Sequence, residues 1–273
     1  MINSHDRMAV LSTALREGSQ MAMSARGHVE GTIKDSDPNQ VVTDADVAIG
    51  RAIQAHIRQS FPQDAVLDEE IGFQAGTSEY TWVIDPIDGT SNFATGVPLF
   101  GVMIGVLLNG EPVVGGIALP ALEETYLAEA GSGALCNGVA IQVTTAPELT
   151  DVLVAWGVDG DRNNRDRTFT EARCAGEIAL AARNLRCSNS VFDQMMVARG
   201  SYGGCVNFSS KIWDNVAPQI IITEAGGIYS DLRGQPLPYR SPGERMNQIY
   251  QWVAASQELH PQLVAITQAY ASR

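Results

Sequence analysis

The sequence predicts an α+β fold of layered helices and sheets, with an antiparallel sheet in the N-terminal half and a mainly parallel sheet in the C-terminal half. Two long helical patterns open the chain, and short apolar runs separated by turn signals follow them. After Pro147 the pattern changes to alternating strand-like and helix-like segments. We therefore expect an N-terminal half over residues 1–146 and a C-terminal half over residues 147–273, joined by an extended interface.

The N-terminal segments are predicted to be two helices joined by a loop. Residues 6–26 repeat apolar side chains along one helical face, and the polar stretch 34–40 follows as a loop. A second helix begins at Thr43, because Asp46 three residues later completes a capping-box pattern. Pro62 ends this helix, since proline cannot continue it.

Short strands separated by turns follow the two helices. Asn109-Gly110 lies between two apolar runs and is a strong hairpin signal, and Asn137-Gly138 marks another turn. This pattern predicts an antiparallel meander packed under the helices. The expected strands cover residues 65–67, 81–84, 100–108, 112–118, 125–129 and 139–143.

Strands and helices alternate in the C-terminal half. The pair Gly226-Gly227 closes one helix, and Pro261 opens the last one. The expected strands cover residues 152–156, a short segment near 185, 202–208 and 252–255. The expected helices cover residues 167–182, 191–199 and 213–225, with a last one from Pro261.

Composition excludes several classes of protein. The 273 residues are 45% hydrophobic and 18% charged, so the chain can bury a sizeable core and is not disordered. A formal net charge of -13 argues against binding to nucleic acid or to an anionic membrane. The longest apolar run, residues 97–108, is too short to span a bilayer, and residues 1–8 lack an apolar signal core. We therefore expect a cytoplasmic protein.

The four cysteines and the four histidines are dispersed along the sequence. The sequence has no close pair of cysteines and no two histidines one helical turn apart, so it predicts neither a zinc site nor a redox pair. We expect reduced, buried thiols. We also expect any bound metal to be a hard cation held by oxygen ligands.

The segment 82–93 carries the most informative motif of the chain. An apolar strand ends at Asp85, and Asp88-Gly89-Thr90 begins a helix whose free N–H groups suit an anion. Two carboxylates beside such a helix end suit a cation together with a phosphate. In an alternative interpretation, Asp88 or Thr90 only caps the helix and Asp85 only closes a turn.

Two further acidic positions lie at the ends of predicted elements. Glu69 belongs to the acidic run 68–70 after a short strand, and Asp214 lies in the first turn of a helix. Taken singly, these acids have alternative roles, as part of a solvated loop and as a partner of the helix dipole. Together with Asp85 and Asp88 they predict four carboxylates that converge at one mouth of the fold. Four such groups repel one another unless cations are present, and oxygen ligands suit Mg²⁺.

Three ordered motifs together resemble the inositol monophosphatase family of Mg²⁺-dependent, lithium-sensitive phosphatases. The motifs are Glu69-Glu70, then Asp85-Pro86-Ile87-Asp88-Gly89-Thr90, then Trp213-Asp214 with Glu224-Ala225-Gly226-Gly227. The resemblance extends from about Met8 to the end of the chain. It implies a layered αβαβα sandwich, commonly a homodimer, that acts on a small-molecule phosphate ester.

The resemblance implies two or three Mg²⁺ ions per site. Glu69, Asp85 and the main-chain carbonyl of Ile87 would hold the first ion. Asp85 would bridge to a second ion, which Asp88 and Asp214 complete. Glu69 would also help to hold a third, weakly bound ion.

The resemblance also implies phosphate and water contacts. The backbone amides of Gly89 and Thr90 would receive the phosphate, as the helix N-terminus already suggests. Thr90 and Asp46 would orient the attacking water, with Glu69 as a further orienting or basic group. Asp46 has an alternative role as the capping residue of its helix, and Lys34 is not counted among the catalytic residues.

The substrate contacts depart from the family pattern at one position. Relatives usually carry a glutamate seven residues before the aspartate of the Trp-Asp pair, where it contacts inositol hydroxyls. Asn207 takes that place here and lacks charge-assisted acceptors. Lys211 would pair with the substrate phosphate or a substrate carboxylate, or would only offset the acidic cluster. We expect the substrate to contact Asp88, Ser190, Asn207, Lys211 and Asp214.

We therefore expect a Mg²⁺-dependent phosphomonoesterase whose substrate is myo-inositol 1-phosphate. Histidinol phosphate is the first alternative, and fructose 1,6-bisphosphate and nicotinamide-type nucleotides are further ones. The sequence Ser91-Asn92-Phe93 favours the inositol branch over the branch that cleaves 3′-phosphoadenosine phosphate. A non-catalytic regulatory partner of the transcription machinery is disfavoured by the intact ligand set. A structural Ca²⁺-binding domain is disfavoured because no acidic loop has Ca²⁺-ligand spacing.

Overall fold

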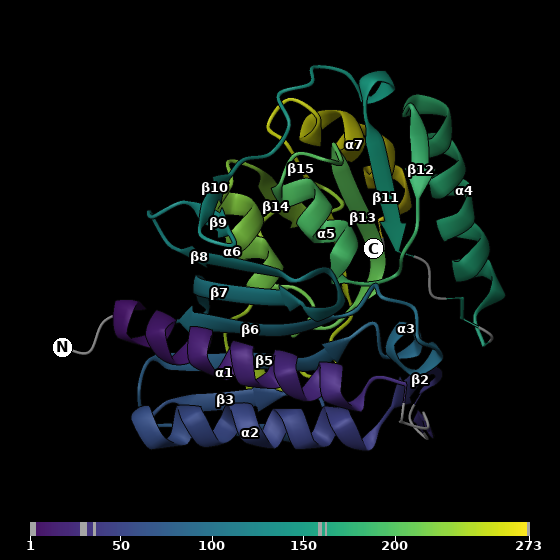
Figure 1. The fold of residues 1–273 in the computed structure, drawn as a ribbon. Coiled ribbons are helices and arrows are strands. Elements are labelled where there is room, and N and C mark those ends of the chain that lie inside the picture. Colours follow the sequence, from purple (N-terminus) through teal and green to yellow (C-terminus); the bar gives the residue numbers. More distant parts are fainter. Residues whose placement is uncertain (1–3, 28–31, 35–36, 158–159, 162, 272–273) are drawn as a thin grey trace.

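The computed structural model describes the chain except for residues 1–3, 28–31, 35–36, 158–159, 162 and 272–273. The described residues form five layers in which helices and sheets alternate (Figure 1). This arrangement confirms the layered α+β fold. The helices are α1 (Ser4–Ala25), α2 (Asp44–Ser60), α3 (Thr90–Thr95), α4 (Arg165–Ala181), α5 (Val191–Ala198), α6 (Val216–Glu224) and α7 (His260–Thr267).

The strands form an eight-stranded sheet, a five-stranded sheet and a two-stranded hairpin. The hairpin pairs β1 (Thr32–Lys34) with β2 (Asp37–Val42). The larger sheet has the order β10 (Val139–Ile141), β9 (Ala134–Cys136), β8 (Glu124–Glu129), β7 (Glu111–Leu119), β6 (Gly101–Leu108), β5 (Tyr80–Asp88), β3 (Ala65–Asp68) and β4 (Gly72–Gln74). The smaller sheet has the order β12 (Asn184–Arg186), β11 (Leu153–Gly157), β13 (Gly204–Ser210), β15 (Tyr250–Ala255) and β14 (Ile228–Asp231).

Three apolar cores hold the layers together. Helices α1 and α2 cover one face of the larger sheet, α5 and α6 fill the space between the sheets, and α4 and α7 cover the outer face of the smaller sheet. Alternate residues of β6 point to different cores: Val102 and Ile104 toward α1 and α2, Met103 and Leu107 toward α5 and α6. Because β6 is buried on both faces, its sequence is a continuous apolar run rather than an alternating one.

Most predicted elements of the N-terminal half are confirmed. The N–H of Thr43 donates to Asp46 Oδ2 at 2.9 Å, which is one arm of the predicted capping box. Asn109 and Gly110 both have positive φ, 53° and 87°, as the turn between β6 and β7 requires. The predicted loop over residues 34–40 is wrong, because β2 begins within it and pairs Val41 and Val42 with β1. Strands β4 and β9 were not predicted, since three residues carry too little periodicity.

The C-terminal sheet is mixed rather than mainly parallel. Strand β11 pairs parallel with β12 and β13, whereas β15 pairs antiparallel with β13 and β14. The prediction failed at β14, a four-residue strand directly after Gly226-Gly227 that the sequence pattern did not reveal. The division of the chain at residues 146 and 147 stays a prediction.

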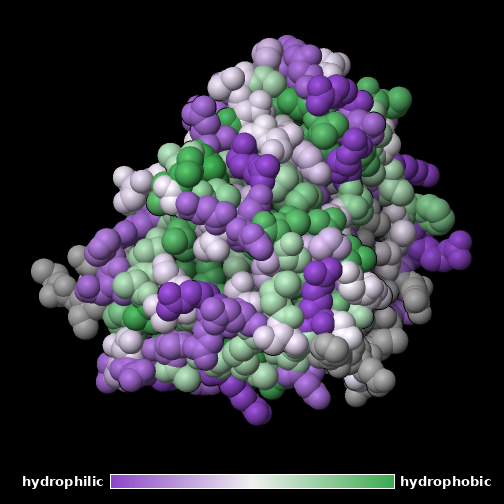
Figure 2. All heavy atoms as spheres, viewed as in Figure 1, coloured by the Kyte–Doolittle hydropathy of each residue, from purple (hydrophilic) through white to green (hydrophobic). Residues whose placement is uncertain are grey.

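The described residues on the face that Figure 2 presents form no single dominant apolar area. Figure 2 shows hydrophilic and hydrophobic residues mixed over the face that it presents. Large exposed apolar side chains come from several separate elements, for example Val139 on β10 and Leu180 on α4. Among the described helices, none combines the length and the apolar character needed to cross a membrane.

Candidate metal site and active site

Asp85 and Asp88 point to the same face of the larger sheet because β5 contains a bulge. Asp85 pairs with Met103 and Asp88 with Gly101, so the two residues between the acids oppose a single residue of β6. In a regular strand, residues three apart point to opposite faces. The bulge cancels this difference and occurs at Pro86, which has no N–H to donate to the ladder. The Asp-x-x-Asp spacing of the sequence therefore brings two carboxylates together.

Asp214 reaches the same place because α6 packs closely against the larger sheet. A side chain at Gly105 would lie 2.6 Å from Val216, and one at Gly115 would clash with Ile220. These two glycines therefore permit the close approach of α6 to β6 and β7. Asp214 precedes α6 by two residues, and its Oδ2 accepts the N–H of Lys211 at 2.6 Å. It thus closes the turn before the helix rather than lying in its first turn.

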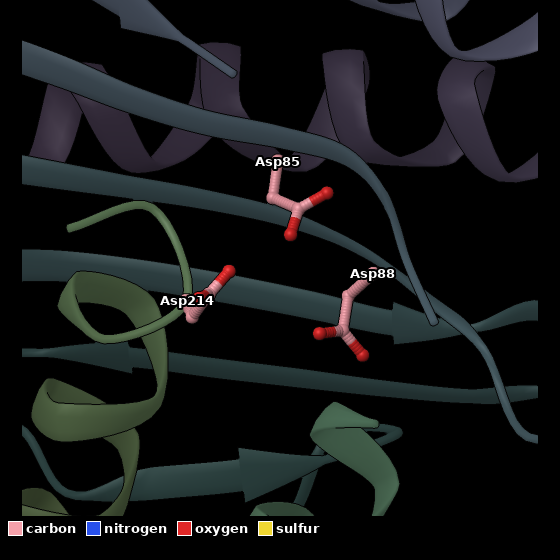
Figure 3. A group of neighbouring side chains, drawn as sticks. All are labelled: Asp85, Asp88 and Asp214. Carbon is pink, nitrogen blue, oxygen red and sulfur yellow. The ribbon is translucent and has the colours of Figure 1, made fainter. Parts of the chain in front are cut away.

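Three carboxylates form one compact group. One oxygen from each of Asp85, Asp88 and Asp214 lies within 4.8 Å of the other two, and the side chains point toward a shared space (Figure 3). Asp85 is only 2% exposed. Its Oδ1 atom is buried and has no hydrogen-bond partner in the described part of the chain. A buried acceptor without a donor is costly, so this atom favours a cation.

The charges around Asp85 affect its protonation. Burial, followed by the negative charges of Glu69, Asp88 and Asp214, raises the pKa of Asp85 well above its ordinary value. Like charges in a buried site raise a carboxyl pKa in this way. A divalent cation among these groups would reverse the effect by favouring the ionised form.

Glu69 approaches the group from the neighbouring strand. Strands β3 and β5 pair in parallel, and the N–H of Glu69 donates to the carbonyl of Ile84 at 3.1 Å. This pair is the one parallel pair among the described strands of the larger sheet. It places Glu69 beside Asp85, whose pKa it raises. Glu69 lies outside the compact group of three, so the structure groups three of the four predicted carboxylates.

Asp88 also contacts the C-terminal half. Its Oδ2 accepts the N–H of Val191, the first residue of α5. The acceptor therefore lies at a helix N-terminus, where a negative charge is favourable. Asp88 thus links the bulge of β5 to a helix that follows it by about a hundred residues.

The turn from β5 into α3 has the form predicted for the phosphate motif. Gly89 caps α3 with a φ of 74°, a conformation that favours glycine. The hydroxyl of Thr90 donates to the carbonyl of Ile87 at 2.9 Å and lies 3.3 Å from Asp46 Oδ1. Thr90 and Asp46, which were predicted to orient one water molecule, therefore lie close together.

Asp46 combines its two proposed roles. Its Oδ2 accepts the N–H of Thr43, as a capping residue does, while its Oδ1 faces Thr90. Burial raises the pKa of Asp46 to about 6, although the two hydrogen bonds from Thr43 lower it. The negative charge of Glu70 raises it further. The capping role and the site role therefore do not exclude each other.

The predicted substrate residues come from separate parts of the fold. Ser190 caps α5, and a side chain at Gly89 would lie 2.9 Å from its Cβ, so the two residues are in contact. Asn207 lies on β13, and its Oδ1 accepts the N–H of Ser209 at 2.6 Å. Lys211 Nζ donates to the carbonyl of Asn247 at 3.0 Å. The side chain of Lys34 lies outside the described residues.

The sequence did not reveal the role of Asp68. A solvated loop was one interpretation of the run 68–70, yet Asp68 is fully buried. Its Oδ1 accepts the N–H groups of Glu70 and Ile71, at 2.9 and 3.0 Å. The sequence signal was Gly50, a glycine inside a helix one turn after Asp46, because such a residue often marks a close contact.

Comparisons with known proteins agree with this geometry. The model of the inositol monophosphatase family matches residues 5–271. The chain is 32% identical over 237 residues to a fructose-1,6-bisphosphatase/inositol-1-monophosphatase of Aquifex aeolicus, covering 86% of this chain and 89% of that protein. It is 34% identical over 208 residues to the Nus factor SuhB of Escherichia coli, covering 76% of each chain. The solved structure of an IMPase from Thermotoga maritima is similar, with a TM-score of 0.85, 28% identity and 97% and 98% of the two chains covered.

Proposed function

Because this chain belongs to the inositol monophosphatase family and is a phosphatase of that superfamily, we propose that it is a Mg²⁺-dependent phosphomonoesterase that hydrolyses myo-inositol 1-phosphate. The observation that carries the proposal is the compact group formed by Asp85, Asp88 and Asp214. Three carboxylates that face one another between two sheets repel, and a cation offsets that repulsion. The family is metal-dependent, and this group supplies the ligands.

The donor set fits Mg²⁺. All of its side-chain donors are carboxylate oxygens, which hard cations prefer, and Asp85 Oδ1 has no hydrogen-bond partner within the described residues. In this proposal Glu69, Asp85, Asp88, Asp214 and the carbonyl of Ile87 hold two or three ions. Bound Mg²⁺ supplies a Lewis acid that lowers the pKa of water and offsets negative charge on the leaving oxygen.

The residues before and at the start of α3 have a binding role in the proposal. The amides of Gly89 and Thr90 lie at a helix N-terminus, where N–H groups lack intrahelical acceptors, and they bind the phosphate. Thr90 and Asp46 orient the attacking water, and Asp46 takes its proton through the Thr90 hydroxyl. The raised pKa of Asp46, about 6, suits a base near neutral pH. Glu69 acts as a second orienting or basic group.

Ser190, Asn207 and Lys211 select the substrate in this proposal. Asn207 Oδ1 already accepts the N–H of Ser209, so we assign its amide group as a donor to a substrate hydroxyl. Fructose 1,6-bisphosphate is the second candidate substrate, because the similar protein of Aquifex aeolicus carries both activities in its name. A partner role in transcription is a further candidate, because several similar proteins are named Nus factor SuhB.

Phosphate release from a panel of esters tests the proposal. The panel contains myo-inositol 1-phosphate, histidinol phosphate, fructose 1,6-bisphosphate and 3′-phosphoadenosine phosphate, each with Mg²⁺ or with a chelator. Asp88→Asn should lower turnover at least about a hundredfold, because it removes one ligand and its charge. Asp151→Asn, the same change at an exposed position, is the matched control and should leave turnover unchanged.

The ester that is hydrolysed at the highest rate identifies the substrate. Turnover that survives chelation, or that Asp88→Asn leaves intact, would contradict the metal-dependent mechanism. If folded protein that binds Mg²⁺ cleaves no ester of the panel, the substrate assignment is wrong and the partner role gains support.

We also propose a homodimer, which light scattering of the purified protein checks directly.

A further inference from the structure

Asp68 is a buried carboxylate directly beside a proposed metal ligand. It is 0% exposed and is the last residue of β3, immediately before Glu69. Its Oδ1 accepts the N–H groups of Glu70 and Ile71, and its Oδ2 accepts Nε2 of Gln54 at 3.2 Å. All three donors face the carboxylate, so Asp68 is satisfied without a metal ion and differs in this respect from Asp85.

One face of α2 is built around this carboxylate. Asp46, Gly50, Gln54 and Arg58 follow one another at four-residue spacing and therefore form one inclined row along the helix. Gln54 bridges Asp68 to Gln74 on β4, since its Oε1 accepts Gln74 Nε2 at 2.8 Å. Arg58 in turn donates to the Oε1 of Gln74 at 2.7 Å. The helix that carries Asp46 is thus linked by hydrogen bonds to both strands that flank Glu69.

Gly50 provides the space for the carboxylate. A Cβ atom at this position would lie 2.6 Å from Asp68 Oδ2 and 3.2 Å from Pro86, so any other residue would displace one of them. Glycine is unfavourable inside a helix, and Gly50 has ordinary helical backbone angles that do not require it. The contact with Asp68 supplies a physical reason for a glycine here.

The backbone of residues 69–71 is fixed from two sides. The N–H of Glu69 donates across the sheet to the carbonyl of Ile84, while the next two N–H groups donate to Asp68. A side chain that accepts backbone N–H groups two and three residues later is the usual way to stabilise such a turn. The direction in which Glu69 leaves the backbone therefore depends on Asp68.

We propose that Asp68 is a positioning residue that holds Glu69 toward the metal site, and that Gly50 is present to admit it. This inference rests on the proposed function, because Glu69 is taken as a ligand there. Asp68 itself does not contact substrate or metal in this proposal. Its role resembles that of the hydrogen-bonded groups behind many metal ligands, whose loss weakens metal affinity by about ten- to a hundredfold.

The test compares variants by their requirement for Mg²⁺. Asp68→Ala should raise the Mg²⁺ concentration at half-maximal turnover by about tenfold, while the KM for the ester at saturating Mg²⁺ changes by less than about twofold. Asp68→Asn keeps one acceptor oxygen for the two N–H groups and should show a smaller rise. Calorimetric titration with Mg²⁺ should show the same order of affinities without any substrate.

A double-mutant cycle tests the role of Gly50. Gly50→Ala should raise the half-maximal Mg²⁺ concentration in the parent protein but have no further effect in Asp68→Ala, because its clash partner has been removed. If the effect persists in the Asp68→Ala background, the clash acts through Pro86 and the inference for Gly50 is wrong.

Asp64→Asn is the matched control, since Asp64 is an equally buried carboxylate bonded to Arg7 and Trp82. It should lower the melting temperature and leave the Mg²⁺ requirement unchanged. If Asp68→Ala and Asp68→Asn lower the melting temperature and also leave the Mg²⁺ requirement and affinity unchanged, Asp68 is only structural. Should the parent protein cleave no ester, the proposed function fails, whereas the calorimetric series still decides the inference.

Discussion

Asp64 and Asp85 are both 2% exposed, yet their surroundings are opposite. The carboxylate of Asp64 accepts two N–H groups of Arg7 at 2.9 Å, the hydroxyl of Ser78 at 2.6 Å and the indole of Trp82 at 2.9 Å. The carboxylate of Asp85 is surrounded by other acids, and its Oδ1 has no donor within the described residues. The first carboxylate is satisfied by the protein alone, whereas the second is not.

The difference separates an acid that stabilises the fold from an acid that we propose to be a metal ligand. A buried charge is tolerable when partners and hydrogen bonds satisfy it, as they do at Asp64. A group of like charges without donors lowers stability, and proteins keep such groups where function requires them. Burial alone therefore does not identify a functional acid. The nature of its neighbours does.

The largest effect is expected from Asp85→Asn. Turnover should fall by at least about a thousandfold, because the most buried of the carboxylates that would hold the ions is lost. In a chelator, the free energy of unfolding should rise by about 1 kcal/mol or more, since a buried, unpaired charge is removed. Steady-state kinetics and urea unfolding measure the two quantities. If the variant is less stable than the parent protein in a chelator, Asp85 does not destabilise the metal-free fold and differs less from Asp64 than we infer.

Asp64→Asn should show the reverse pattern. Removing one partner of a buried pair takes the charge of Asp64 away from Arg7, and we expect a loss of about 3 kcal/mol in the free energy of unfolding. The folded fraction should keep its turnover within about twofold, because the side chains that donate to Asp64, namely Arg7, Ser78 and Trp82, are not members of the acid group. Chemical unfolding followed by assays at low temperature tests both statements. A large loss of activity in fully folded protein would contradict the assignment.

Asp46 is intermediate between Asp64 and Asp85, because it is buried and hydrogen-bonded but also has a raised pKa. Burial raises its pKa to about 6 in the native state, above the ordinary value near 3.8 that the unfolded chain keeps. The native state therefore binds more protons between these pH values, and the free energy of unfolding falls as the pH rises through this window. In a chelator, the parent should lose on the order of 2 kcal/mol relative to Asp46→Asn between about pH 4 and pH 7. If the difference in free energy of unfolding between the parent and Asp46→Asn does not change with pH, the pKa of Asp46 is not raised.

The smallest effect on stability is expected from Glu224→Gln. The two carboxylate oxygens of Glu224 accept the N–H groups of Gly131 and Gly133, each at 2.8 Å, so this residue holds the turn between β8 and β9 against α6. Glu224→Gln keeps one acceptor and loses the charge, and we expect a loss of about 1 kcal/mol in stability. Turnover and the Mg²⁺ requirement should not change. A shift in the Mg²⁺ requirement would show that this end of α6 affects the site.

The fold could be predicted where the local pattern is strong. The helices α1 and α2, the turns at Asn109-Gly110 and Asn137-Gly138, and the strands from β5 to β8 follow from periodicity and turn residues. Several short strands, namely β1, β4, β9 and β14, could not be predicted, because pairing with a neighbour stabilises them rather than their own sequence. One of them, β14, pairs antiparallel with β15, so the five-stranded sheet is mixed rather than mainly parallel.

The candidate site could be predicted in part. Asp85, Asp88 and Thr90 lie within six residues of one another, and the bulge at Pro86 brings the two acids to one face. The ordered motifs of the sequence also indicate Asp214. The family resemblance indicated Thr90 and Asp46 as residues near the attacking water, and the structure places their side chains 3.3 Å apart. The burial of Asp68 and its close contact with Gly50 were missed, because the sequence alone does not distinguish a buried aspartate at the end of a strand from an exposed one.

The sequence by itself determined local features of this protein: the capped helix at Thr43 and the turn at Gly89 that begins α3. These features depend on residues close in the chain, so their physics is contained in short segments. The tertiary structure decided which distant acids meet. Parallel pairing of β3 with β5 places Glu69 beside Asp85, and the packing of α6 on Gly105 brings Asp214 to the group. Such contacts depend on the shape of the packed layers, which no short segment specifies.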